Sequence, residues 1–319
     1  MKKGILVVGV DGGATKTAAV LADGSGVPLA RSVTGPSNFQ IIGPEEAGKA
    51  ILKAVEECCA AAGFKVTEVD AVVAGLTGAG REVDQKRMAE ALVTIAASRN
   101  VSLKNLRIVT DALIALEGAF RGAPGVILIA GTGSIALGKK SEGSVARAGG
   151  WGRVIGDEGS GYAIGRAGMA AICRHLDGRG QSTLLTGMVA STFGLSTQEE
   201  IIRHVYREGF DLGSIAPLVL QCAGDGDAVC LAILRSAAAD LVDHVRAVLR
   251  QMGISDGRAR LALAGGVLAG GGLFSKILRR DLAEQFPSIA IHEPELSPAE
   301  GAALMAIKLL SASTTSGGL

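Results

Sequence analysis

The sequence predicts an α/β protein of two domains in which the order βββαβαβα occurs twice. Two short apolar segments, one near the N-terminus and one beginning at Gly125, each enter a tight glycine-rich turn and leave on another short apolar segment. Alternating helical and strand patterns follow each pair. A chain of 319 residues is long for a single hydrophobic core. We therefore expect an N-terminal domain over residues 1–118, a C-terminal domain over 119–311 and a flexible tail over 312–319.

The first copy opens on the run Ile5–Val10, which is short, rich in valine and bounded by glycine, as buried strands are. The turn Asp11–Thr17 follows it, and the next apolar run, Ala18–Ala22, is too short for the helix that a P-loop would open. We therefore expect a strand on both sides of the turn. The later elements of this copy are expected to be the strand Leu29–Val33, the helix Pro44–Gly63, the strand Val69–Ala74, the helix Val83–Ala97, the strand Leu106–Thr110 and the helix Ala112–Phe120.

The second copy repeats this order with one large insertion. Its expected elements are the strands Gly125–Ala130, Ile135–Gly138 and Ser144–Ala148, a helical insertion over about 156–253, the strand Leu261–Ala264, the helix Leu273–Gln285 and the strand Ser288–Ile291. Ser297, with Glu300 three residues later, predicts the capped start of a last helix that runs to about Leu310. This helix (297–310) could return to the first domain.

Composition narrows the classes of partner. The net charge of +1 and an aromatic content of 3% give no reason to expect binding to nucleic acid or to a membrane. Five cysteines, an odd number without paired CxxC spacing, argue against a disulfide framework and a structural zinc site. We expect them to be small buried hydrophobic residues of a cytoplasmic protein.

The turn Asp11–Thr17 has the residues of a phosphate site. Gly12 and Gly13 lack a Cβ atom, so their amides could approach an anion closely, while Thr15 adds a hydroxyl and Lys16 a positive charge. Asp11 would repel a bare phosphate unless a cation lay between them. The turn therefore predicts a site for phosphate together with Mg²⁺, although an ordinary glycine-rich hairpin would have the same pattern.

Several motifs together carry a family resemblance. They are Asp11-Gly-Gly-Ala-Thr-Lys-Thr17, Asp111 at a strand end, Gly131-Thr-Gly-Ser134, Ala264-Gly-Gly-Val267, Gly149-Gly-Trp-Gly152 and Gly156-Asp-Glu-Gly-Ser160. The duplicated unit resembles the ribonuclease H-like, actin-like ATPase fold of the sugar kinase, Hsp70 and actin superfamily. The last two motifs resemble the N-acetylglucosamine and glucosamine kinases that are grouped with the BadF/BadG/BcrA/BcrD ATPases.

The resemblance implies a nucleotide cleft between the two domains. The phosphates of ATP would be held by the turn around Gly12 and by Gly131, Thr132, Gly133 and Ser134, and the adenosine by Gly265, Gly266 and Gly270. Asp11 would position Mg²⁺ through water, and Asp111 would accept the proton of the attacking hydroxyl. The sugar contacts that the resemblance implies are Asn38, Thr77, Gly78, Asp111, Thr132 and Asp157. Without the resemblance, a strand-end aspartate such as Asp111 would more readily be a helix N-cap.

The activity that the resemblance implies is transfer of phosphate from ATP to N-acetylglucosamine or glucosamine, at the 6-hydroxyl, by a homodimer joined through the helical insertion. Three alternatives stay open: an ATPase that activates a dehydratase or a benzoyl-CoA reductase, a kinase for N-acetylmuramic acid or another hexose, and a sugar-sensing or scaffold protein that keeps the fold without the chemistry. The presence of both Asp11 and Asp111 argues against the last of these. The roles of Trp151 and Glu158 are also open, since either side chain could contact the substrate or only pack.

Overall fold

The computed structural model describes residues 4–315 and divides the chain into two compact units. Unit 1 contains the chain up to Pro124 together with the C-terminal segment from Glu293 onward. Unit 2 is the continuous segment Gly125–His292. The C-terminal helix therefore belongs to the same unit as the N-terminal strands.

Unit 1 is built on a five-stranded sheet of order β3-β2-β1-β4-β5. Its strands are β1 (Leu6–Gly12), β2 (Thr17–Asp23), β3 (Pro28–Thr34), β4 (Ala71–Leu76) and β5 (Leu106–Thr110). The first three strands pair antiparallel, whereas β1, β4 and β5 are parallel. The carboxyl ends of these three strands therefore meet at one edge of the sheet, where ligands commonly bind in α/β proteins.

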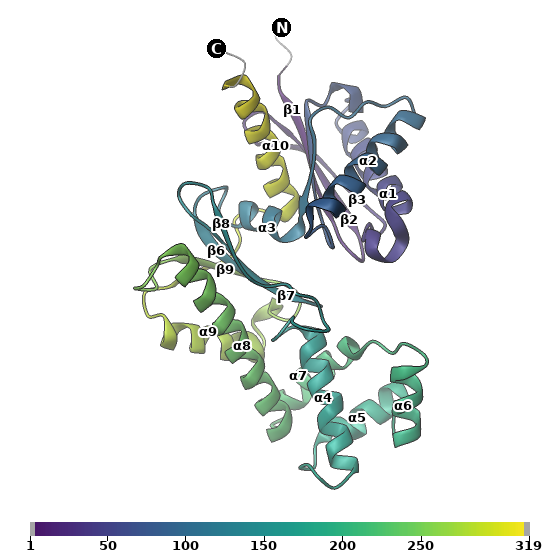
Figure 1. The fold of residues 1–319 in the computed structure, drawn as a ribbon, viewed down its shortest axis with the longest axis vertical. Coiled ribbons are helices and arrows are strands. Elements are labelled where there is room, and N and C mark those ends of the chain that lie inside the picture. Colours follow the sequence, from purple (N-terminus) through teal and green to yellow (C-terminus); the bar gives the residue numbers. More distant parts are fainter. Residues whose placement is uncertain (1–3, 316–319) are drawn as a thin grey trace. The chain divides into compact units, whose positions relative to one another are not determined.

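Helices cover both faces of this sheet. Figure 1 shows α1 (Phe39–Ala61) and α2 (Glu82–Ser98) on one face, with α3 (Asp111–Ala119) and α10 (Pro298–Thr315) on the other. A short 3-10 helix, η1 (Val66–Glu68), precedes β4. One apolar cluster fills the layer under α1 and α2, and a second, smaller cluster lies under α3 and α10.

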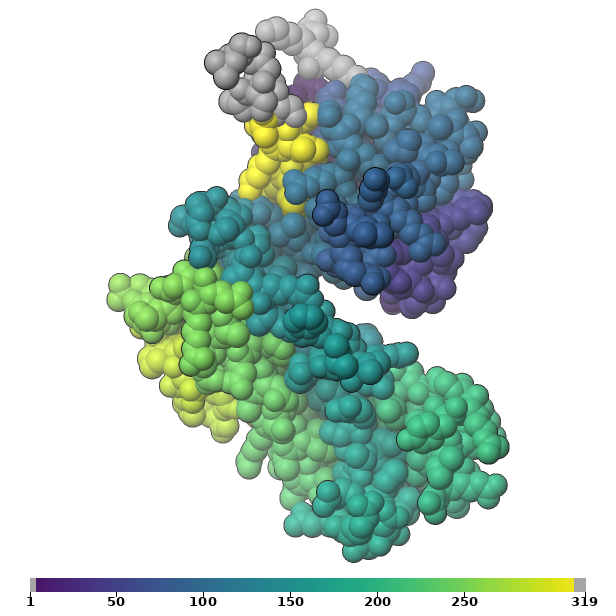
Figure 2. Space-filling model, viewed as in Figure 1, coloured from purple at the N-terminus to yellow at the C-terminus, as the bar shows by residue number. Residues whose placement is uncertain are grey.

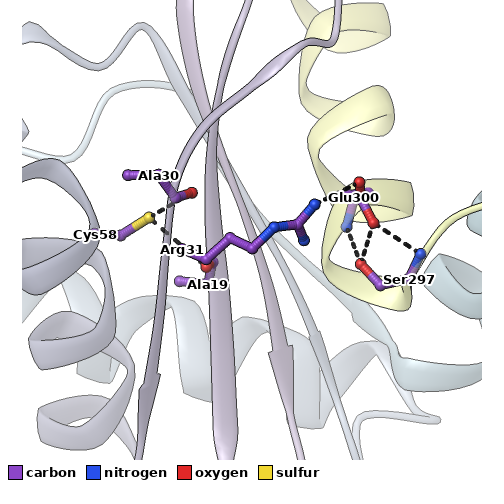
Figure 3. A network of polar contacts seen from close by, with 6 residues as sticks. All are labelled: Ala19, Ala30, Arg31, Cys58, Ser297 and Glu300. Carbon is purple, nitrogen blue, oxygen red and sulfur yellow. Dashed lines mark hydrogen bonds and ion pairs between the residues drawn. The ribbon is translucent and has the colours of Figure 1, made fainter. Parts of the chain in front are cut away.

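The N-terminus of α10 is fixed to the edge strand β3. Ser297 and Glu300 form the expected capping box, with the Ser297 hydroxyl donating to the Glu300 carboxylate at 2.5 Å and accepting from the Glu300 amide at 3.3 Å. Arg31 on β3 reaches the same carboxylate at 2.9 Å (Figure 3). Burial raises the pKa of Glu300, but the hydrogen bonds from Arg31 and Ser297 outweigh it and lower this pKa to about 2. The N-terminal strand β3 and the C-terminal helix α10 are thus joined by an ion pair.

Two helix boundaries differ from those that the sequence predicts. The helix expected from Pro44 begins at Phe39, because the Asn38 side chain caps it by accepting from the Gln40 amide at 3.1 Å. Gly43, with a φ of 82°, then interrupts the helix just before Pro44. The last helix continues to Thr315 rather than stopping near Leu310. Residues 316–319 of the expected tail lie outside the described part of the chain.

Unit 2 repeats the sheet of unit 1, with strand order β10-β9-β6-β7-β8. Its strands are β6 (Gly125–Ala130), β7 (Ser134–Lys139), β8 (Val145–Gly149), β9 (Arg260–Ala264) and β10 (Ala290–His292). The last strand begins two residues later than the sequence predicts. Again β6, β7 and β8 pair antiparallel while β6, β9 and β10 are parallel. The duplicated α/β order expected from the sequence is therefore confirmed.

The helices of unit 2 include the large insertion. They are α4 (Gly161–Leu176), α5 (Leu184–Phe193), α6 (Gln198–Tyr206), η2 (Leu212–Ile215), α7 (Ala216–Gly224), α8 (Ala228–Met252), η3 (Ala269–Gly271) and α9 (Leu273–Gln285). α8 packs along β7 and β8, whereas α5 and α6 lie at the end of the unit that is away from its sheet (Figures 1 and 2).

No single helix within residues 4–315 is long and apolar enough to cross a membrane. By length and composition alone, the helical segments Leu212–Gly224 and Ala228–Met252 taken together could make up a membrane span, but the pair is bent by 115° at the break between them.

Candidate functional site

The turn after β1 is held in a fixed shape by its own backbone. The Gly13 amide donates to the Lys16 carbonyl at 3.0 Å, and the Gly13 carbonyl accepts from the Ser37 amide at 3.0 Å. A Cβ atom at position 12 would lie 2.5 Å from both Leu76 Cδ2 and Ser37 Oγ, so any other residue there would displace these neighbours. Thr15 and Lys16 are exposed at the tip. The turn has the compact, glycine-dependent form that the sequence predicts.

The structure also shows two residues beside the glycines of this turn, Thr17 and Ser37, that the sequence pattern did not single out. Thr17 is buried, and its hydroxyl donates to the Gly35 carbonyl at 2.7 Å and lies within hydrogen-bond distance of Ser37 Oγ, also at 2.7 Å. These bonds tie the beginning of β2 to the segment that leads into α1. A threonine directly after the glycine turn and a serine just before a helix cap were the available signals.

Three of the predicted residues meet at the carboxyl edge of the unit 1 sheet. Asp11 ends β1, Thr77 follows β4, and Asp111 follows β5, the neighbouring parallel strand. Thr77 Oγ1 donates to Asp111 Oδ2 at 2.7 Å. The N-cap of α3 is Thr110, whose side chain accepts from the Leu113 amide at 3.1 Å. The alternative of Asp111 as the N-cap is therefore wrong, and its carboxylate is held by Thr77 instead.

Electrostatics mark Asp11 as an unusual carboxylate. Burial and the nearby charge of Asp111 raise the pKa of Asp11 to about 6, and the positive charge of Lys16 opposes part of this rise. Two carboxylates within reach of each other, with one lysine to compensate, form a site of negative potential. Oxygen ligands of this kind suit Mg²⁺, and a bound divalent cation would relieve the repulsion.

Asn38 and Gly78 lie on neighbouring segments of the same edge. The Asn38 side chain caps α1, because its Oδ1 accepts from the Gln40 amide, and this uses part of its capacity for hydrogen bonds. A Cβ atom at position 78 would lie 2.7 Å from Gln40 Cγ, and the φ of Gly78 is 90°. The loop after β4 and the start of α1 are therefore in close contact, with Gln40 between the two predicted sugar contacts.

The turn after β6 in unit 2 is the counterpart of the turn after β1. The Gly131 amide donates to the Gly133 carbonyl at 2.9 Å, and the Gly131 carbonyl accepts from the Gly161 amide at 2.8 Å. Thr132 is exposed, and its carbonyl accepts from the Tyr162 amide at 3.4 Å. The first residues of α4 therefore fix this second turn.

Asp157 lies directly against the second turn. Its side chain is buried, with 9% exposed, and its Oδ1 accepts weakly from the Ser134 amide at 3.4 Å. A Cβ atom at position 133 would lie 2.9 Å from Asp157 Oδ2, so Gly133 makes room for the carboxylate. Ser134 Oγ donates to the Glu158 carbonyl at 2.6 Å. Ser160 caps α4, accepting from the Ala163 amide at 3.2 Å. A sugar contact for Asp157 stays a prediction.

The glycines expected at the adenosine lie beside the second turn. Gly265 follows β9, the strand parallel to β6, and its φ of 102° brings it against the backbone of Ala130. The Val267 amide donates to the Ala130 carbonyl at 3.2 Å. Gly266 is next to Gly131. Gly270, with a φ of 74°, lies farther along, in η3 before α9. Unit 2 thus places the predicted phosphate turn and most of the adenosine loop side by side.

Other features of unit 2 lie near this turn. Trp151 is 70% exposed, with the Arg147 guanidinium carbon 5.7 Å from its ring centre. A cavity of about 640 Å³ lies between α4 and α8. Glu158 and Gly159 line it, but the predicted phosphate, adenosine and sugar residues do not.

Comparison with known proteins identifies the family. A profile of the BadF/BadG/BcrA/BcrD ATPase family matches residues 8–306. The chain belongs to this family. Membership of the ATPase family implies the use of ATP, and the resemblance inferred from the sequence motifs is confirmed.

The relatives are similar over nearly their whole length. An N-acetylmuramic acid/N-acetylglucosamine kinase of Clostridium acetobutylicum is 32% identical over 94% of this chain and 97% of its own. An N-acetyl-D-glucosamine kinase of Dictyostelium discoideum is 32% identical over 95% and 98% of the two chains. The crystal structure of a candidate N-acetylglucosamine kinase from Chromobacterium violaceum covers 95% of this chain and 99% of its own, with 30% identity and a TM-score of 0.75. The fold of this chain is thus shared with the Chromobacterium violaceum protein.

Proposed function

We propose that this chain is an ATP-dependent amino-sugar kinase that phosphorylates N-acetylglucosamine or glucosamine at the 6-hydroxyl. The observation that carries the proposal is the similarity, over nearly the whole chain, to relatives that are named as kinases of N-acetylated amino sugars. The geometry supports it, because each unit has a glycine turn that suits phosphate and unit 1 adds two carboxylates at the same sheet edge.

In this proposal Asp111 is the catalytic base. Its Oδ2 is fixed by Thr77 and its Oδ1 accepts from the Ala112 amide at 2.8 Å, so the carboxylate has a defined orientation. A base at the end of a strand can accept the proton of the sugar hydroxyl as that oxygen attacks the γ-phosphorus, while the bond to the β-phosphate breaks. Asn38 and Asp157 would hold other hydroxyl groups of the sugar.

The residues around Asp11 fit Mg²⁺ as a cofactor. No group of three or more His, Cys, Asp or Glu side chains within the described residues could hold a metal ion. The protein would therefore supply few direct ligands, and Asp11 would act mainly through the water around the ion. Mg²⁺ bound with ATP neutralises charge on the phosphates, and Asp11 would orient the pair toward Gly12 and Gly13.

We propose a cytoplasmic homodimer joined through the helical segment 156–253, and a monomeric mass in light scattering at micromolar concentration would refute the dimer.

An activator of a dehydratase would need cysteines placed for an iron–sulfur cluster. Cys58, Cys59, Cys222 and Cys230 are buried, and burial also raises the pKa of Cys173, which lies within α4. The kinase is therefore the better proposal.

The direct test is a coupled assay of ADP release with glucosamine, N-acetylglucosamine, N-acetylmannosamine, N-acetylmuramic acid and glucose. We expect an amino sugar to stimulate release strongly over the rate with ATP alone. Asp111→Asn should keep ATP and sugar binding but lose at least about 10² in turnover. Release that no sugar stimulates would reject the kinase, and near-normal turnover in Asp111→Asn would remove Asp111 from the mechanism.

A further inference from the structure

His244 is a buried titratable group that the proposed reaction does not use. It lies on α8, with 9% of its surface exposed, and its Nε2 is 3.7 Å from Glu158 Oε2. At that separation the contact is longer than a hydrogen bond, and it is an ion pair when the imidazole is protonated. Glu158 belongs to the loop Gly156–Ser160, in which the Asp157 carboxylate and the Glu158 carbonyl contact the second phosphate turn. His244 therefore contacts the side chain of a residue whose backbone is bonded to this turn.

The fit between α8 and the neighbouring glycines is tight. A Cβ atom at position 149 would lie 2.5 Å from His244 Nε2, and one at position 159 would lie 2.5 Å from Leu241 Cγ. Leu241 and His244 are three residues apart and so lie on the same side of α8. One face of the insertion helix thus packs against both the end of β8 and the loop Gly156–Ser160.

A cavity of about 640 Å³ between α4 and α8 borders the same loop. Glu158 and Gly159 line it, while Leu241 packs against Gly159. The titratable groups that face His244 are Glu158 from the loop, Asp240 from α8 and Asp157 from the loop. Burial lowers the pKa of His244, and the three carboxylates oppose this shift.

We propose that His244 is a positioning residue that holds the loop Gly156–Ser160 against the second phosphate turn through Glu158, and so sets the orientation of Asp157. The link continues through the Glu158 carbonyl, which accepts from Ser134 Oγ at 2.6 Å, and through Asp157, which contacts Gly133. The importance of this link for sugar phosphorylation rests on the proposed function, whereas the link itself does not.

The test uses the full chain and needs neither ATP nor sugar. Arg153 lies in the exposed segment that leads into the loop, so trypsin cleavage after Arg153 reports how often the segment opens. His244→Leu removes the ring nitrogen contact and keeps an apolar side chain of similar bulk. Glu158→Gln removes the charge from a side chain that is 49% exposed, and so should not impair folding. The matched control is His204→Leu, which breaks a similar contact, at 3.4 Å, between His204 on α6 and Glu208 just beyond the end of that helix.

We expect cleavage after Arg153 to rise roughly tenfold in His244→Leu and in Glu158→Gln, with no further rise in the double variant. His204→Leu should cleave like the wild type, and His244→Gln, which keeps an N–H near the position of Nε2, should restore most of the protection. Wild-type cleavage in Glu158→Gln, or additive effects in the double variant, would overturn the proposal.

Steady-state kinetics distinguish a positioning role of His244 from a general loss of protein stability. If an amino sugar is phosphorylated, His244→Leu should raise the KM for the sugar and lower kcat by about tenfold or more, with the KM for ATP changed much less. Equal changes in both KM values would overturn the positioning role. If no sugar is phosphorylated by the wild type, the proposed function fails, while the proteolysis result still decides whether His244 holds the loop.

Discussion

Replacing Asp11 by asparagine should stabilise unit 1 while it impairs activity. In the folded chain, burial and the charge of Asp111 raise the pKa of Asp11 from 3.8 to about 6. Since the folded pKa is the higher one, ionisation of this carboxyl opposes folding as the pH rises past 3.8, and the cost is complete above about 6. A shift of this size corresponds to at most about 3 kcal/mol near pH 8 and about half of that near pH 5.

The assay is urea unfolding of wild type and Asp11→Asn at both pH values, without Mg²⁺ or nucleotide. The variant should be the more stable protein, by up to about 3 kcal/mol near pH 8 and by less near pH 5. The matched control is Asp23→Asn at the other end of the same hairpin, where hydrogen bonds from Ser25 and Val27 lower the pKa of the exposed Asp23 and no gain is expected. A less stable Asp11→Asn near pH 8, or a gain that does not depend on pH, would refute the reasoning.

Three further substitutions test other parts of the account. Thr77→Val removes the donor to Asp111, so kcat should fall about tenfold at unchanged thermal stability, measured by steady-state kinetics and thermal unfolding; an unchanged kcat would contradict this. Gly133→Ala would put a Cβ atom 2.9 Å from Asp157 Oδ2, so turnover should fall. Full activity would contradict this prediction, because it would mean that Asp157 can shift away from the new Cβ atom without loss of function. Glu300→Gln should cost about 1 kcal/mol at neutral pH. That cost should disappear as the pH falls from 4.5 toward about 2, where the wild-type carboxylate is itself protonated, and a pH-independent difference in urea unfolding would contradict it.

The sequence was sufficient for the fold because the same local pattern occurs twice. A glycine-rich turn between two short apolar runs is a local signal, and so is Asp111 directly after a strand. The helix start at Phe39 was harder to predict from the sequence. Pro44 is itself a favoured first helical residue, so it indicated a later start than the cap at Asn38.

The arrangement around Asp157 depends on contacts that no local pattern shows. Asp157 has a φ of 58°, a left-handed conformation that is uncommon outside glycine, and this backbone aims its carboxylate at Gly133. His244 lies more than eighty residues later in the chain and reaches the same loop from α8. Tertiary packing alone brings these residues together, so only the structure could associate them.

The central claim is that the chain transfers a phosphoryl group to an amino sugar rather than to water. The most direct measurement is the phosphorus NMR spectrum of a reaction that contains the wild-type protein, ATP, Mg²⁺ and N-acetylglucosamine. The account predicts a phosphomonoester signal coupled to the two protons on carbon 6 of the sugar. ADP and inorganic phosphate without any phosphomonoester would contradict it.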